Sequence, residues 1–169
     1  MRRYLVAGNW KMNTLRQSAA ALSAELASVA AVEEPGVAVL VCPPYPYLLP
    51  VGDVLGGSAV RLGAQDVYFE SPGAFTGEVA VEMLRDVGCR YVLIGHSERR
   101  AILGETDAVI NRKLRAAIAG GLTVVLCLGE QLSERQSGQT EAVLDRQMEG
   151  AFAGISDSEA AGTVIAYEP

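Results

Sequence analysis

The sequence predicts an α/β fold in which parallel strands alternate with helices, and three observations support this. About six short apolar runs occur along the chain, and they are continuous rather than alternating. Segments with helical spacing of apolar residues lie between these runs. Polar side chains follow directly after several runs, as at the carboxyl ends of strands where such folds bind ligands. Continuous apolar strands are buried on both faces, which is typical of a parallel sheet covered by helices.

The strands are expected where the apolar runs occur, and each run is closed by a polar or turn-forming residue. The expected strands are residues 4–7, 37–42, 59–64, 91–94, 122–128 and 163–167. The residues that close them are Gly8, Pro43, Gln65, Gly95, Gly129 and Glu168. The third run is weaker than the other five.

Helices are expected between the strands, where apolar residues recur at a spacing of three or four. The expected apolar stripes are Leu22, Leu26 and Val29; Val79, Met83 and Val87; Ile110, Leu114, Ala117 and Ile118; and Leu144, Met148 and Ala151. Shorter helices are expected at residues 47–55 and 97–103. The expected helix ends are Pro35 with Gly36, Gly56 with Gly57, Gly88, and Gly120 with Gly121, and Thr106 or Asp107 can cap the helix of Ile110.

Such a series can wind into an open doubly wound sheet or a closed (β/α)8 barrel. A dinucleotide-binding sheet is disfavoured because no GxGxxG follows the first strand. A barrel needs eight strands and about 250 residues, whereas this chain has 169 residues and about six strands. Residues 1–169 are therefore expected to form a single, incomplete barrel domain, truncated from a longer protein. Two strand edges would then stay open for pairing or aggregation.

The composition excludes several classes of partner. The formal net charge of −6 argues against binding to nucleic acid or to an anionic membrane. No apolar stretch approaches the roughly 18 residues of a membrane span, and the first residues are too short an apolar run for a signal peptide. The three cysteines, Cys42, Cys89 and Cys127, have no metal-binding spacing. They predict free thiols in a reducing cytoplasm.

Three strand ends carry the candidate chemistry. Asn9 and Lys11 follow the first strand, His96 and Glu98 follow the fourth, and Glu168 follows the sixth. In a parallel barrel these ends share one face. An ammonium, an imidazole and a carboxylate together suit proton abstraction next to a carbonyl group, in which the carboxylate takes the proton and the other two stabilise the enediolate.

Each candidate also has a plainer interpretation. His96, the only histidine of the chain, could be a satisfied core residue. Lys11 could be a solvated loop lysine, Glu98 could pair with a neighbouring arginine or cap a helix, and Glu168 could be an ordinary loop acid. Cys127 is interpreted as a small core residue, because no second histidine exists to activate it as a nucleophile.

Five segments carry a resemblance to a known family. They are Gly8-Asn-Trp-Lys-Met-Asn13, Gly73-Ala-Phe-Thr-Gly-Glu78, Ile94-Gly-His-Ser-Glu-Arg-Arg100, Cys127-Leu-Gly-Glu130 and Ala166-Tyr-Glu-Pro169. In order and spacing they resemble the signature segments of the triosephosphate isomerases, over the whole chain. The resemblance implies a TIM barrel and a cytoplasmic isomerase of glycolysis and gluconeogenesis. It would interconvert dihydroxyacetone phosphate and glyceraldehyde 3-phosphate without a metal or an organic cofactor.

The resemblance also implies roles for individual residues. Glu168 matches the family's catalytic base, and His96 matches its electrophile. Lys11 and Asn9 match the pair that binds the substrate and stabilises charge, and Glu98 matches an acid near that lysine. His96 directly precedes the expected helix of residues 97–103, whose positive end would favour a neutral imidazole.

The loop of residues 70–78 is expected to make a homodimer. The resemblance implies that it reaches into the neighbouring subunit, where Thr76 approaches the partner's Asn9. Phe75 is unusually apolar for a surface loop, and it would be buried in a partner. Met12 is also assigned to this interface.

Two other interpretations stay open. The family's lid, its last two strands and its phosphate grip would follow Pro169, so a polypeptide of these 169 residues is expected to be a poor catalyst. It could therefore be an impaired fragment that serves only as a dimerising module. Alternatively it could be another phosphosugar isomerase or an epimerase, although the absence of a metal-binding His/Asp set counts against metal-dependent members.

Overall fold

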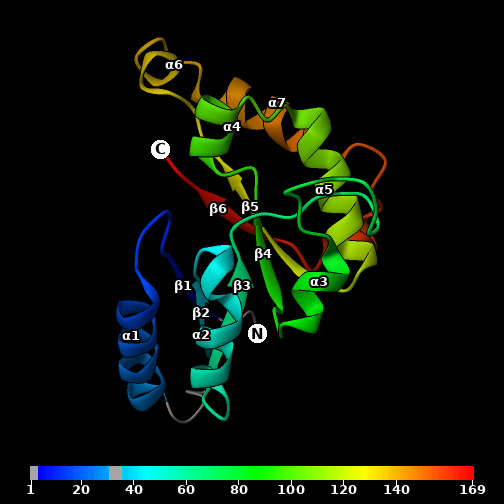
Figure 1. Cartoon of the computed structure of the whole chain (residues 1–169). Helices are drawn as coiled ribbons and strands as arrows, with labels where there is room; N and C mark the ends of the chain where they lie inside the picture. The colour runs from blue at the N-terminus through cyan, green and yellow to red at the C-terminus, as the bar shows by residue number, and fades with distance from the viewer. Residues whose placement is uncertain (1–3, 31–35) are drawn as a thin grey trace. The chain divides into compact units, whose positions relative to one another are not determined.

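The computed structural model of the chain describes residues 4–30 and 36–169 (Figure 1). The chain divides into two compact units. Met1–Asp66 and Glu82–Val92 form the first, and Val67–Val81 and Leu93–Pro169 form the second. Strand β4 belongs to both, because its first residues lie in the first unit and its last residues lie in the second.

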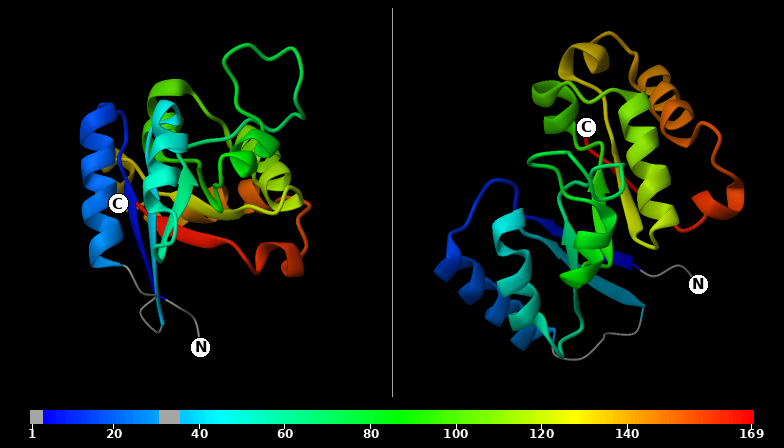
Figure 2. Two further views of the ribbon diagram at one scale, coloured as in Figure 1. Left: turned by 60° about the horizontal axis from the view of Figure 1, so that its bottom comes forward. Right: turned by 45° about the vertical axis from the view of Figure 1, so that its right-hand side comes forward.

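The first unit is a parallel sheet with helices. Its elements are β1 (Tyr4–Asn9), α1 (Arg16–Val29), β2 (Val37–Cys42), η1 (Tyr45–Tyr47), α2 (Leu48–Leu55), β3 (Val60–Ala64) and most of α3 (Val81–Asp86). The strands pair in chain order up to the start of β4 (Tyr91–Ile94), with Tyr4 opposite Val37 and Gly63 opposite Tyr91. Helices α1 and α2 of this unit pack side by side (Figures 1 and 2).

The second unit continues the same alternation. Its elements after β4 are α4 (Ser97–Leu103), α5 (Asp107–Ala119), β5 (Thr123–Leu128), α6 (Leu132–Gln136), α7 (Thr140–Phe152), α8 (Asp157–Ala160) and β6 (Val164–Tyr167). Strands β5 and β6 are parallel, with Leu128 opposite Tyr167. Helix α7 packs against α5 and β5. The polar residues that follow β5 and β6 therefore meet at one edge of this unit.

The predicted strands are confirmed with small differences at their ends. β2 and β4 cover the predicted residues, and β1 extends beyond Ala7 to Asn9. Strands β2 to β5 are largely buried, as continuous apolar runs predict. The two strands that have one neighbour each, β1 and β6, are more exposed, with Val6 59% and Ile165 45% accessible.

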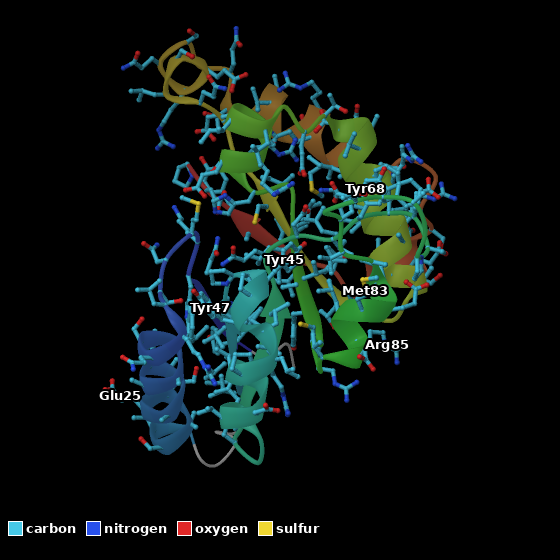
Figure 3. The ribbon with its side chains drawn as sticks, viewed as in Figure 1. Glu25, Tyr45, Tyr47, Tyr68, Met83 and Arg85 are labelled. Carbon is cyan, nitrogen blue, oxygen red and sulfur yellow. The ribbon has the colours of Figure 1, made fainter. Side chains whose placement is uncertain are left out.

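Three helices bury a different face from the one that the apolar stripes predict. Helix α1 buries Ala19 and Ser23, not Leu22, Leu26 and Val29. Small residues allow close packing, and the Ser23 hydroxyl is satisfied within the helix because it donates to the Ala19 carbonyl oxygen at 2.6 Å. Helix α3 buries Val81 and Leu84, whereas Met83, which is labelled in Figure 3, is 47% exposed.

Helix α7 is the third case and matters for the site. Its buried residues are Val143, Gln147 and Ala151, so Ala151 is buried as predicted, whereas Val143 and Gln147 are buried in place of Leu144 and Met148. A pattern of apolar residues cannot predict a buried glutamine.

The helix ends follow the predicted turn chemistry where the structure describes them. Thr106 caps α5, because its side chain accepts a hydrogen bond from the Val109 amide. Gly88 adopts a positive φ of 90° after α3. Pro35, which was expected to end the first helix, lies outside the described residues, and α1 has already ended at Val29.

Candidate active site

The turn after β4 places His96 at the start of α4. Gly95 has a φ of +74°, and a side chain there would approach the Cys127 carbonyl oxygen to 3.2 Å. The residue must therefore be glycine for the chain to turn here. His96 then becomes the N-cap of α4 and is only 6% exposed.

Hydrogen bonds define the tautomer of His96. The Glu98 backbone N–H donates to Nδ1 at 3.2 Å, so Nδ1 is an acceptor and carries no proton. Nε2 must then carry the proton of a neutral ring, and it lies 3.0 Å from Oε1 of Glu168. The Glu98 carboxylate is also 3.5 Å from Nδ1, but the backbone amide, which can only donate, decides the assignment.

Glu168 is positioned by the end of β6. Its backbone N–H donates to the Leu128 carbonyl oxygen at 2.8 Å, which continues the pairing of β6 with β5. Its carboxylate accepts from the Ser97 amide through Oε2 at 3.1 Å and lies against His96 through Oε1. The carboxylate thus lies at the N-terminal end of α4, where the helix dipole favours an anion.

Glu130 forms a second polar cluster beside Tyr167, and the sequence analysis assigns it no role. It is 7% exposed and accepts hydrogen bonds from the Tyr167 hydroxyl (3.0 Å), the Thr140 hydroxyl (3.1 Å) and the Arg135 guanidinium (3.1 Å). Its own backbone N–H and these donors hold its pKa below the usual range despite burial. Its place directly after a strand, like that of His96, is the signal that could have identified it.

Cys127 lies at the end of β5 and is buried, as expected for a core residue. Burial raises the pKa of its thiol to about 12, and the nearby Glu168 carboxylate adds to this effect. Burial likewise raises the pKa of Cys89 to about 12. Neither thiol is a nucleophile near neutral pH, because the thiolate is the reactive form.

We expect Cys89 and Cys127 to react with iodoacetamide at pH 8 about 1,000-fold more slowly in the folded chain than in urea, because a pKa of about 12 removes nearly all thiolate. The raised pKa values also make the free energy of unfolding depend on pH. The stabilisation that the two neutral, buried thiols contribute is complete below about pH 8.5 and is lost as the pH rises toward 12. Peptide mapping after timed labelling measures both rates. A Ser133→Cys variant provides an exposed thiol on α6 as a control. Labelling of Cys127 as fast as this control would contradict the prediction.

In the first unit, Asn9 and Lys11 are held by local hydrogen bonds. The Lys11 amide donates to the Asn9 side-chain oxygen at 2.9 Å. The Gln65 side chain donates to the carbonyl oxygens of Lys11 (2.9 Å) and Cys42 (2.8 Å). Lys11 has a φ of +52°, which is uncommon for a residue with a side chain. The loop after β1 is therefore fixed in a strained conformation.

The structure brings the predicted site residues together in two groups. His96, Glu98 and Glu168 meet in the second unit, and Asn9 and Lys11 meet in the first. Of the residues assigned to an interface, Met12 is 96% exposed, Phe75 is 40% exposed and Thr76 is exposed. The loop that carries Phe75 and Thr76 contains no helix or strand (Figure 2). The Phe75 ring packs on Tyr68 with a centroid distance of 5.0 Å.

Neither a metal site nor a membrane segment is evident within residues 4–30 and 36–169. No group of three His, Cys, Asp or Glu side chains in this part of the chain could hold a metal ion. None of its helices combines the length and the apolar character needed to cross a bilayer.

Comparisons with known proteins agree on one family. The family model described as triosephosphate isomerase matches residues 4–169. A triosephosphate isomerase of Rhodopirellula baltica is 49% identical over 99% of this chain and 66% of its own length. One of Dechloromonas aromatica is 51% identical over all of this chain and 67% of its own length. The chain thus spans about two thirds of the length of these relatives.

A solved structure confirms the predicted fold class. The crystal structure of triosephosphate isomerase from Bartonella henselae matches with a TM-score of 0.89 and 39% identity, covering 99% of this chain and 68% of the other. The fold is therefore an α/β fold with about six of the eight strands of a (β/α)8 barrel.

Proposed function

Because the chain belongs to the triosephosphate isomerase family, we propose that its residues carry the interconversion of dihydroxyacetone phosphate and glyceraldehyde 3-phosphate. One observation supports this proposal most strongly. The Glu168 carboxylate lies 3.0 Å from Nε2 of a His96 ring whose Nδ1 accepts a backbone N–H. A general base, the Glu168 carboxylate, therefore lies next to a neutral hydrogen-bond donor, the His96 ring. This pair suits proton transfer next to a carbonyl group.

The proposed reaction begins at C1 of dihydroxyacetone phosphate. The Glu168 carboxylate takes a proton from C1, and the electron pair of that C–H bond moves onto the C2 carbonyl oxygen to give an enediolate. The Nε2–H of His96 donates a hydrogen bond to this oxygen and then transfers its proton to it. Glu168 then delivers its proton to C2, and the C1 hydroxyl proton passes to Nε2 of His96, which leaves the aldehyde at C1 and returns both residues to their starting state.

The Glu168 carboxylate contacts the Ser97 amide and the His96 ring. The carboxylate must leave the Ser97 amide and the His96 ring to reach a substrate C–H bond. The substrate carbonyl oxygen would then replace Oε1 of Glu168 at Nε2. The roles of Lys11 and Asn9 in binding the phosphorylated triose and stabilising charge, and of Glu98 as an acid near Lys11, belong to the same proposal.

A cytoplasmic homodimer is the proposed form of the protein, and residues 1–169 are proposed to be one incomplete TIM-barrel domain. The exposed Met12 and Phe75 support a protein partner, because exposed apolar side chains are stabilised by burial in an interface, and the neighbouring Thr76 is exposed as well. The three free cysteines fit a reducing compartment. Native mass spectrometry at micromolar concentration tests the dimer, and a monomer at all concentrations would contradict it.

The function is tested by following dihydroxyacetone phosphate in D2O by NMR. Proton abstraction at C1 replaces hydrogen with deuterium even where few molecules complete the isomerisation. We expect deuterium to enter C1 faster with the protein than in buffer alone. An exchange rate equal to that of buffer would refute the proposal. It would then favour the dimerising module without catalysis.

A further inference from the structure

We infer that Gln147 and Gly129 position the catalytic base, so that the side chain of Gln147 acts on Glu168 through the Gly129 peptide. We refer to the Gln147 side chain and the Gly129 backbone as the clamp. This inference rests on the proposed function, because that function assigns the base to Glu168. Neither member of the clamp is a catalytic residue, since neither is assigned a contact with the substrate.

The Gln147 amide holds both polar groups of Gly129. Its Nε2 donates to the Gly129 carbonyl oxygen at 2.9 Å, and its Oε1 accepts from the Gly129 N–H at 3.0 Å. Gln147 is 5% exposed on the buried face of α7. Two bonds from one buried amide to one residue fix that residue relative to α7, and loss of either would leave a buried polar group without a partner.

Gly129 in turn lies against the backbone of Glu168. A Cβ atom at position 129 would be 1.9 Å from the Glu168 carbonyl oxygen and 2.9 Å from its carbonyl carbon. The φ angle of Gly129 is not positive, so glycine is required for the close approach and not for its backbone conformation. The Glu168 N–H donates to the carbonyl oxygen of Leu128, the residue before Gly129, at 2.8 Å. Residues 128 and 129 therefore contact both polar groups of the Glu168 backbone.

The position of the carboxylate follows from this arrangement. The Glu168 side chain begins at a backbone that is held by residues 128 and 129, and it ends 3.0 Å from His96 Nε2. A displacement of about 1 Å at a reacting group can cost roughly 100-fold in rate. Any movement of the Gly129 peptide would be passed to Glu168, because no free space separates them. The clamp thus connects α7 to the base.

The only histidine of the chain provides a direct test. A long-range ¹H–¹⁵N correlation spectrum gives the shift of His96 Nε2, which depends on its contact with Glu168. A Glu168→Ala variant supplies the reference shift without the carboxylate. We expect Gly129→Ala and Gln147→Met, both in the 169-residue chain, to move the Nε2 shift toward this reference. The rate of deuterium entry into dihydroxyacetone phosphate should fall about 10- to 100-fold in both.

Matched controls separate positioning from general destabilisation. Asn111→Leu removes two amide hydrogen bonds, to the carbonyl oxygens of Ala151 and Ala153, in the same unit. Gly120→Ala places a Cβ atom 2.2 Å from Cγ1 of Val81, again away from Glu168. Both should lower the midpoint of urea unfolding and leave the His96 Nε2 shift at its parent value. If Gln147→Met does not fold, Gln147→Glu keeps the acceptor for the Gly129 N–H and loses the donor.

The outcomes distinguish this inference from the proposed function. An unchanged Nε2 shift in the clamp variants would overturn the inference, as would an equal change in the controls. A Glu168→Ala shift identical to that of the parent would overturn it as well, because Glu168 would then not contact His96 in solution. A shift that moves as expected, in a chain that exchanges no deuterium into the triose, would support the clamp and refute the proposed function.

Discussion

Replacing Glu168 with glutamine is expected to lower the turnover of triose phosphate by about 1,000-fold or more, because an amide cannot accept the C–H proton. Glutamine has nearly the same shape, and its amide oxygen can still accept from the Ser97 amide that now binds Oε2. The fold should therefore survive, and the loss should appear in kcat with little change in KM. Coupled assays of glyceraldehyde 3-phosphate formation measure both constants.

The best control for this prediction is Glu149→Gln, an identical change on an exposed position of α7. This variant should retain turnover within about two-fold, since surface substitutions away from special features usually change little. If Glu168→Gln kept more than a tenth of the parent turnover, Glu168 would not be the base.

The length of the polypeptide is expected to change turnover by a factor of similar size. A polypeptide of residues 1–169 should turn over at least about 1,000-fold more slowly than the same residues followed by the C-terminal third of the Rhodopirellula baltica relative. The family resemblance assigns the lid and the phosphate grip to this last third, and barrel phosphate sites come from the loops after the last two strands. Without a lid, water reaches the enediolate and elimination of phosphate competes with reprotonation.

The comparison of lengths has an internal control. Glu168→Gln in the extended chain should remove the gained activity, because the proposed base at position 168 lies in the part that both lengths share. Methylglyoxal, the product of phosphate elimination, should form in a larger proportion with the short chain. Equal turnover by the two lengths would contradict the prediction.

The sequence predicts the strands well, because a buried parallel strand must be a continuous apolar run. β2 and β4 therefore occupy the predicted residues. The same reasoning identifies His96 and Glu168 as strand-end residues, and the structure brings them to 3.0 Å. That distance is not predictable from the pattern, since it depends on side-chain torsions and on the amides of α4.

The sequence predicts helix faces less well, and α1 and α7 give the reasons. In α1 the buried residues are Ala19 and Ser23, whose small size outweighs the hydrophobicity of Leu22 and Val29. In α7 a glutamine is buried because its two hydrogen bonds to Gly129 replace those to water. Such compensation depends on a partner 18 residues away, and a local pattern contains no information about that partner.

The positive φ of Lys11 has a consequence for which residue evolution would favour at position 11. A left-handed residue with a side chain costs about 1–2 kcal/mol relative to glycine, and here the neighbouring Gln65 and Asn9 hold it in place. Stability alone would favour glycine at this position, because glycine adopts a positive φ without strain, whereas the proposed reaction requires the lysine ammonium group. Under the proposed function, glycine at position 11 would therefore raise stability and at the same time remove the ammonium group that the reaction uses.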